Sequence, residues 1–349
     1  MDTNLFSYSY PHELIAHHPL KERDAARMLV LDRSTGTITH TGVRALPERL
    51  RTGDVLVINT SRVIPARLIG QRESGGQIEI LLVAPCTEPS RWWCLATRTN
   101  RLKSGDRITF AEGLEGRIEK REGDRIAIAF NANGDLLQQL DRIGLTPLPP
   151  YIDRSDDLDS IDRERYQTVY ADLPGSAAAP TAGLHFTERL LDAVRARGAI
   201  IAPLTLYVSS DTFAPVHTDR IEDHTMHGER YEIPAETIAA VTAAKCDGRR
   251  VIAVGTTTVR ALESAYNRAG SPQRGPDLTG ISGTTRLFIM PGYEFRIVDA
   301  ILTNFHQPCS TLLMLVSAFA GLDRIKHAYA EAVAERYRLF SYGDCMLMT

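Results

Sequence analysis

Three segments of the sequence place hydroxyl, imidazole, amide and guanidinium groups where a polar loop leads into the start of a helix. The segments are residues 179–186, 255–260 and 303–311. The candidate site residues in them are Pro180, Thr181, Gly183, His185, Thr256, Thr257, Thr258, Arg260, Asn304, Phe305 and His306. A helix start offers unpaired N–H groups and the positive end of the helix dipole. Loops of this kind therefore suit a carboxylate or a phosphate.

The simplest interpretation of each loop is that its Thr or Ser residues are helix N-caps. In α/β sheets, however, ligands bind at the carboxyl ends of the strands, where such loops converge. Capping alone is a weaker explanation for three loops that share this form and carry His, Asn and Arg. We therefore predict that the three loops form one binding site.

Other site motifs are absent or weak. No G-x-G occurs, which excludes the dinucleotide-binding fingerprint, and there is no phosphate-binding P-loop. His224 and His227 have i, i+3 spacing near Glu222 and Glu229, but a metal site needs further ligands in good geometry. We expect a hydrogen-bonding loop there and no metal.

The composition is typical of a soluble globular protein, with 43% apolar and 24% charged residues. A length of 349 residues indicates about two domains. Forty Lys and Arg against 43 Asp and Glu give a net charge of −3, which excludes a surface built throughout to coat nucleic acid but permits a local basic face. Five cysteines without a C-x-x-C pair indicate reduced thiols. We expect a cytoplasmic protein without a membrane segment, and a monomer because no assembly signal stands out.

The elements that must position the site fall into two groups. Between residues 63 and 150, β-forming runs at 77–84, 92–97, 107–110 and 125–130 lie between turn signals, and a helix is expected at 136–143. This spacing predicts a small antiparallel sheet or barrel. A Pro-rich connector at 147–150 follows it.

Strands and helices alternate in the remainder of the chain. Helices are expected at 187–197, with Thr187 as N-cap, and at 235–246, 257–269, 310–320 and 323–337. Strands are expected at 55–59, 200–208, 249–254, 287–290 and 295–298. The alternation predicts an α/β (α+β) main body, residues 1–62 and 151–349, into which residues 63–150 are inserted as a separate β domain.

Longer motifs make the family recognisable. They occur at residues 10–16 (YPHELIA), 65–68 (PARL), 75–82 (GGQIEILL), 147–152 (PLPPYI), 166–171 (YQTVYA), 291–295 (PGYEF) and 340–344 (FSYGD), together with the three loops. With these motifs the sequence closely resembles the S-adenosylmethionine:tRNA ribosyltransferase-isomerase family of queuosine synthesis, almost from end to end. The resemblance implies an α/β body with a small Greek-key β-barrel.

The resemblance also implies an activity. Family members transfer and isomerise the ribosyl part of S-adenosylmethionine onto a 7-aminomethyl-7-deazaguanine at the tRNA wobble position, giving epoxyqueuosine and releasing adenine and methionine. S-adenosylmethionine is then a co-substrate, no resident cofactor is implied, and the partner is a tRNA anticodon stem-loop.

Chemical roles follow as hypotheses. The sulfonium acidifies the ribose C5′ proton, so the site needs a base with a pKa near neutrality, and His185 or His306 fits best. The other histidine, or a protonated Asp344, is a candidate donor to the departing adenine. The threonines at 256–258 with Arg260 are candidates to hold the methionine carboxylate or a tRNA phosphate. Asn304 and Phe305 are candidates to bind and stack a base.

The sequence departs from the family pattern in one loop. Where the family has T-L-H-V-G-x-G-T-F, this chain has TLYVSSDTF at 205–213, so that a histidine and two glycines are replaced between Tyr207 and Asp211. Two alternatives therefore stay open: a diverged paralogue that uses S-adenosylmethionine on another amine, and an inactive RNA-binding homologue.

Overall fold

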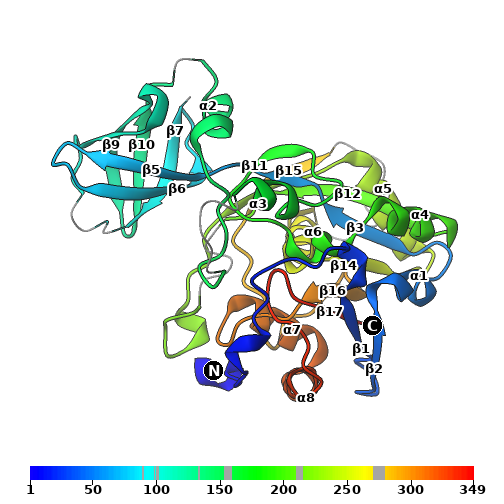
Figure 1. Cartoon of the computed structure of the whole chain (residues 1–349). Coiled ribbons are helices and arrows are strands. Elements are labelled where there is room, and N and C mark those ends of the chain that lie inside the picture. Colours follow the sequence, from blue (N-terminus) through cyan, green and yellow to red (C-terminus); the bar gives the residue numbers. More distant parts are fainter. Residues whose placement is uncertain are drawn as a thin grey trace.

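The main body is built on a twisted mixed sheet, seen at the centre and right of Figure 1. The computed structural model describes residues 1–88, 90–97, 99, 102–132, 134–152, 159–209, 215–269 and 280–349. In spatial order the strands of the sheet are β15 (Ile281–Thr285), β13 (Glu229–Ile233), β12 (Ile200–Leu206), β3 (Val55–Asn59), β14 (Val251–Val254), β16 (Ala300–Asn304), β17 (Cys345–Met348), β1 (Arg27–Leu31) and β2 (Ile38–Gly42). The four central strands β12, β3, β14 and β16 run parallel, and β17 runs antiparallel to β16. The carboxyl ends of the parallel strands therefore share one edge with the segment that leads into β17.

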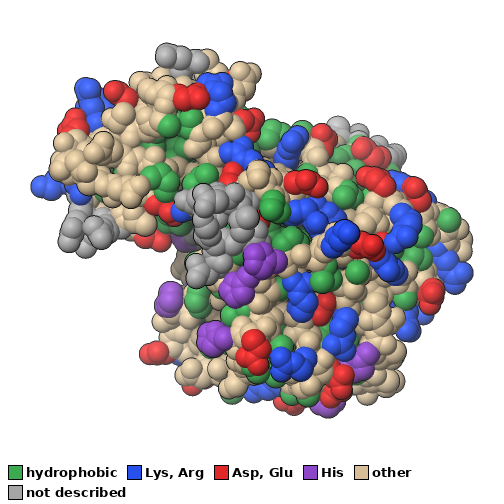
Figure 2. All heavy atoms as spheres, viewed as in Figure 1, with side chains coloured by type: hydrophobic (Ala, Val, Ile, Leu, Met, Phe, Trp, Pro, Cys, Tyr) green, Lys and Arg blue, Asp and Glu red, His purple; other side chains and the backbone are tan. Residues whose placement is uncertain are grey.

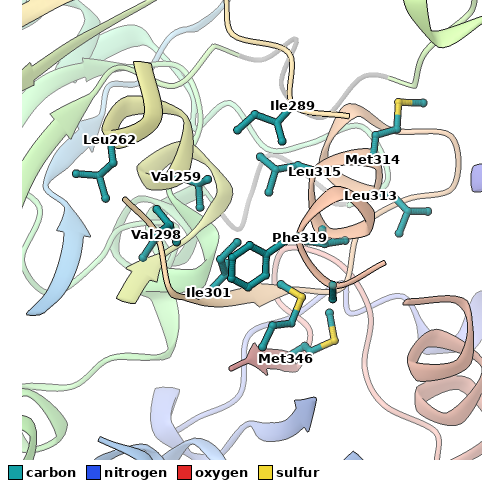
Figure 3. Close-up of a cluster of buried hydrophobic side chains, with 14 of the residues drawn as sticks. Val259, Leu262, Ile289, Val298, Ile301, Leu313, Met314, Leu315, Phe319 and Met346 are labelled. Atoms are coloured by element: carbon teal, nitrogen blue, oxygen red, sulfur yellow. The ribbon is translucent and has the colours of Figure 1, made fainter. Parts of the chain in front are cut away.

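Helices cover both faces of this sheet. The helices of the body are α1 (Leu46–Arg49), α3 (Asp159–Arg165), α4 (Glu188–Ala196), α5 (Ala235–Cys246), α6 (Thr256–Ala269), α7 (Thr311–Ala320) and α8 (Leu322–Ala334). Along β3, Val55 and Val57 pack with α5 and α6, while Leu56 packs on the opposite face with α1 and α4. Burial on both faces explains why these strands are continuous apolar runs. Figure 3 shows Ile301 and Met346 of the sheet packed against Phe319 of α7.

The second group of strands forms a closed barrel, at the upper left of Figure 1. Its strands are β5 (Arg67–Arg72), β6 (Gln77–Pro85), β7 (Arg91–Ala96), β8 (Arg107–Thr109), β9 (Glu115–Glu122) and β10 (Arg125–Phe130), followed by α2 (Leu136–Ile143). The neighbours β8-β5-β6-β7 have the Greek-key order, in which the fourth strand returns beside the first. The α/β body and the Greek-key barrel expected from the sequence are therefore confirmed, whereas the domain limits at 62 and 150 stay a prediction.

Two short strands, β4 (Ser61–Val63) and β11 (Leu173–Ser176), pair in parallel beside the connection to the barrel. In the described ranges, no helix combines the length and apolar character that a membrane span requires.

The strands expected at 287–290 and 295–298 are wrong, and β15 lies upstream of them. Buried side chains of α6 bind the backbone of this segment in place of a neighbouring strand. The Glu263 carboxylate accepts N–H bonds from Ile297 and Val298, both at 3.0 Å. The Arg260 guanidinium donates to the Leu287 carbonyl at 3.0 Å. The residues from 287 to 298 are apolar and rich in β-formers, but they form an irregular segment because side chains of α6 take the place of a partner strand.

Glu263→Gln should destabilise the body by about 2–3 kcal/mol, because the bonds to these backbone N–H groups lose their charge assistance and an amide NH2 replaces one acceptor oxygen, while the side-chain volume is kept. Urea unfolding measures this loss of stability when it is followed by far-ultraviolet circular dichroism, which reports on the helices of the body. Tryptophan fluorescence is unsuitable because Trp92 and Trp93 both lie in the barrel strand β7. The exposed Glu294 provides the matched control. Equal stability of Glu263→Gln and Glu294→Gln would contradict the anchoring role.

Candidate active site

The three candidate loops meet at the carboxyl edge of the sheet. Gly255, which follows β14, donates its N–H to the Leu302 carbonyl of β16 at 2.8 Å. The 3-10 turn η8 (Thr181–His185) reaches the same edge, where Asn304 Nδ2 lies 3.4 Å from His185 Nε2. The three loops therefore lie at one edge of the sheet, whereas their forming one binding site stays a prediction.

Two pockets open at this edge. The first, here called the aromatic pocket, is lined by Tyr151, Thr181, Asn304, Phe305, His306, Gln307, Ser310, Leu312, Phe340 and Ser341. The second, here called the arginine pocket, is lined by Pro19, Leu20, Arg23, Ala26, Arg165, Leu184, His185, Ser341, Tyr342 and Gly343. Ser341 lines both pockets, and the contact between Asn304 and His185 joins them.

Asn304 occupies the junction between the two pockets. Its Nδ2 lies 3.0 Å from the Phe340 carbonyl and 3.4 Å from the Ser341 carbonyl, and because both are acceptors the amide nitrogen must face them. The contact of this donor with His185 Nε2 favours the tautomer that carries its proton on Nδ1. Asn304 Oδ1 is then a buried acceptor without a hydrogen-bond partner among the described residues.

The wall shared by the pockets is the segment from Arg338 to Asp344, which precedes β17. Phe340 adopts a left-handed backbone conformation (φ 69°), which is costly for a residue with a side chain. Gly343 is required, because a Cβ atom there would lie 2.5 Å from the Arg338 carbonyl oxygen. Asp344 fixes the segment by accepting the N–H groups of Arg27 and Arg338, both at 2.8 Å.

Both histidines are held in the neutral form. Burial lowers the pKa of His185 to about 4, and the charges of Arg338 and Arg23 contribute in the same direction. Burial lowers the pKa of His306 to about 3. The His306 ring contacts Thr303 Oγ1 through Nε2 at 2.9 Å. Neither pKa is near neutrality, as the sequence analysis required of a base, because desolvation disfavours the imidazolium.

Five of the predicted residues line the pockets: Thr181, His185, Asn304, Phe305 and His306. Phe305 is fully buried, and its ring packs edge-on against Tyr329 and Tyr337, which leaves no free face for a base to stack on. Pro180, Gly183, Thr256, Thr257, Thr258, Arg260 and Asp344 line neither pocket. Gly183 is a packing requirement, since a Cβ there would approach the Tyr170 hydroxyl to 2.3 Å.

Arg260 is already paired. It forms a buried ion pair with Glu229, and both side chains are 3% exposed. Thr258 Oγ1 donates to the Val254 carbonyl at 2.7 Å, as a side chain within a helix commonly does. These contacts give the start of α6 a structural role, and they contradict the expectation that Arg260 presents an open fork to a ligand anion.

The sequence analysis missed several residues of the pocket walls. Tyr151 bonds Ser341 through their hydroxyls at 2.6 Å, and Tyr8, outside both pockets, donates its hydroxyl to the His306 carbonyl at 2.7 Å. Arg23 and Arg165 flank His185 in the arginine pocket. Ser341 and Tyr151 lie in two of the motifs quoted above, so motif membership was the available signal, whereas no local pattern distinguishes the two arginines.

The loop that differs from the family pattern, residues 205–213, is described only in part. Ser209 donates its N–H to Glu229 Oε1 at 2.9 Å, so this loop approaches the partner of Arg260 rather than His185. Ser210 and Asp211 lie outside the described residues.

These features define an α/β protein that carries a Greek-key barrel and a buried two-pocket histidine site at the carboxyl edge of its sheet. The queuosine biosynthesis protein family matches residues 3–348. The chain belongs to this family, as the sequence motifs indicated.

Full-length relatives agree. S-adenosylmethionine:tRNA ribosyltransferase-isomerase of Geotalea uraniireducens is 51% identical over 350 residues, covering 100% of both chains. The protein with the same name from Syntrophotalea carbinolica is 50% identical and covers 98% of both. The crystal structure of S-adenosylmethionine tRNA ribosyltransferase from Thermotoga maritima is 37% identical, with a TM-score of 0.55 over 99% of this chain and 100% of that one.

The two low histidine pKa values make the fold sensitive to acid. Between pH 6.5 and about 4, the unfolded chain binds a proton at His185 and His306 that the native chain does not, so the free energy of unfolding falls as the pH falls. The full loss is on the order of 3 kcal/mol for each histidine. Urea unfolding at pH 7, 5.5 and 4.5 measures it. His306→Gln should flatten the pH dependence, whereas the exposed His327 changed to Gln should not; equal slopes in both variants would refute this account.

Proposed function

We propose that this protein transfers and isomerises the ribosyl group of S-adenosylmethionine onto the aminomethyl group of a 7-deazaguanine in tRNA, with release of adenine and methionine. The observation that carries the proposal is the position of His185, a buried neutral imidazole at the junction of an aromatic pocket and an arginine-lined pocket. Family membership and full-length relatives that bear the name of this activity support it.

The reaction begins with loss of the C5′ proton, which the adjacent sulfonium acidifies. His185 is unprotonated at neutral pH, and in the favoured tautomer its basic lone pair is on Nε2, the nitrogen that contacts Asn304. We assign it the role of base. Burial keeps the site dry, which strengthens the attraction between the forming imidazolium and the ylide carbanion.

The aromatic pocket suits the adenine. Tyr151 and Phe340 pack with their ring centroids 5.0 Å apart and form an apolar wall, while Asn304 Oδ1 offers a buried acceptor that matches the adenine amino group. Thr181 and His306 complete the lining, and we assign His306 the role of hydrogen-bond donor to the departing base. The aromatic and amide groups therefore recognise a purine, and the imidazole stabilises the charge that develops on it.

The remaining candidates act on the shape of the site. Asp344 fixes the shared wall, while Arg260 and Thr258 hold α6 in place through Glu229 and the Val254 carbonyl. Burial raises the pKa of Asp344, but its two N–H partners favour the carboxylate. We therefore propose positioning roles for these residues in place of direct contact with substrate.

The proposal includes an anticodon stem-loop as the part of tRNA that is bound, a monomeric enzyme, a cytoplasmic location and the absence of a resident cofactor. These four points stay predictions from the sequence. A single stem-loop requires only a local patch of positive charge, and Figure 2 shows Lys and Arg side chains spread over the body among acidic ones.

Adenine release tests the function directly. Purified protein with S-adenosylmethionine should release adenine only when the tRNA carries the aminomethyl-deazaguanine. His185→Gln should lower kcat by about 10²- to 10⁴-fold, the usual contribution of a general base, with little change in S-adenosylmethionine binding. His327→Gln is the control, because that histidine is exposed on α8.

The outcomes separate the alternatives. Release with another amine acceptor alone would identify a diverged paralogue, and absence of release from folded protein that binds tRNA would identify an inactive RNA-binding homologue. Near wild-type turnover by His185→Gln would remove His185 from the role of base.

A further inference from the structure

The arginine pocket contains positive charge that is not neutralised locally. Arg23 donates only to backbone carbonyls, those of Glu164 at 3.1 Å and of Arg165 and Leu184 at 3.4 Å. Arg165 donates to the carbonyls of Leu20 at 2.6 Å and Lys21 at 3.3 Å. Within the described part of the chain, neither guanidinium has a carboxylate within ion-pair distance.

Arg338, the first residue of the shared wall, also lacks a carboxylate partner among the described residues. Its guanidinium donates to the His18 carbonyl. Its Nη1, like Nε of Arg165, is buried and has no hydrogen-bond partner among the described residues. Glu164 and Asp344 act on Arg23 and Arg338 only from beyond ion-pair distance. Buried polar atoms without partners are rare in folded proteins, and here two of them belong to cations near one pocket.

Burial lowers the pKa values of two of these arginines, Arg23 and Arg338. Desolvation lowers the pKa of Arg23, and the neighbouring charge of Arg165 lowers it further. Desolvation also lowers the pKa of Arg338. Charges held close together and away from water stabilise the fold poorly, so an anion between them would relieve both the desolvation and the repulsion.

We infer that the arginine pocket binds the carboxylate of the amino-acid end of the sulfonium substrate, with Arg23 and Arg165 as its principal partners. This inference rests on the proposed function, because it uses S-adenosylmethionine as the ligand. The planar guanidinium fork matches a carboxylate, and His185 lines the same pocket. In the substrate, the carboxylate is separated from the sulfur by the short amino-acid chain, and the C5′ carbon is attached to that sulfur on the other side. One ligand can therefore place its anion at the arginines and its acidic C–H group at His185.

A nucleic-acid phosphate is the competing anion, and the surroundings disfavour it. An open groove continues from Arg23 and Arg165. Besides these two arginines, its lining contains two basic residues, Lys21 and Arg189, against four acidic ones, Glu22, Asp24, Glu164 and Glu188. A phosphodiester backbone requires a continuous positive track, whereas a single small carboxylate requires only the enclosed arginines.

Equilibrium binding without tRNA tests the inference. The wild-type protein should bind S-adenosylmethionine at least about tenfold more tightly than decarboxylated S-adenosylmethionine, as measured by isothermal titration calorimetry. Arg165→Gln and Arg23→Gln should each weaken binding of S-adenosylmethionine by about tenfold, and should leave binding of the decarboxylated ligand within about twofold. Arg62→Gln is the matched control, because Arg62 is an exposed arginine outside the pocket.

Three results would overturn the inference: equal affinity of the wild-type protein for the two ligands, no binding of either ligand, or equal losses for both ligands in the variants. A tRNA-binding assay completes the test, since weaker tRNA binding by Arg165→Gln with unchanged ligand discrimination would assign the arginines to a phosphate. The wild-type comparison needs no variant, so it holds even if Arg23→Gln fails to fold. Carboxylate preference without adenine release would disprove the proposed function and leave this inference intact.

Discussion

The amide of Asn304 connects the sheet to both pockets of the site. β16 carries Asn304 at its carboxyl end, where Nδ2 donates to the segment before β17 and contacts His185. Because β17 pairs antiparallel with β16, Asn304 and Cys345 are directly opposite, which brings this segment to the site edge. This segment passes between the two pockets. Phe340 has a strained backbone there, and position 343 has room only for a glycine. One hydrogen-bonded side chain thus sets both the pocket wall and the orientation of the histidine.

Local patterns predicted the regular elements well. Thr187 caps α4 as predicted, and the helix of residues 136–143 has the expected bounds, whereas Ser310 caps α7 instead of being its first residue. The segment after β15 could not be predicted, because its backbone bonds come from Glu263, which is more than thirty residues away along the chain. β17 was also missed, since a four-residue apolar run has no helix or strand signature without its neighbours.

The sequence predicted which loops lie at the candidate site, but only part of what their individual residues contact. The three loops do meet, because parallel strands present their carboxyl ends on one edge, a rule that needs no knowledge of side-chain contacts. Which groups face a ligand depends on pairing across the chain. The sequence does not show that Arg260 is paired with Glu229, which lies thirty-one residues earlier. Arg23 and Arg165 carry no recognisable local pattern, and among the described residues they have no carboxylate partner within ion-pair distance.

Burial is the main reason why the free site holds a weak base, and the unneutralised arginines add to its effect. The charged groups that act on His185 are Arg23 and Arg338, with Glu164 and Asp344 lying beyond them. Both cations disfavour the imidazolium, in the same direction as burial. A carboxylate bound between the arginines would offset part of their charge, whereas the sulfonium of the same ligand adds positive charge near His185, so binding does not turn His185 into a strong base. The acidity that the sulfonium gives to the C5′ proton is therefore what allows a weak base to act.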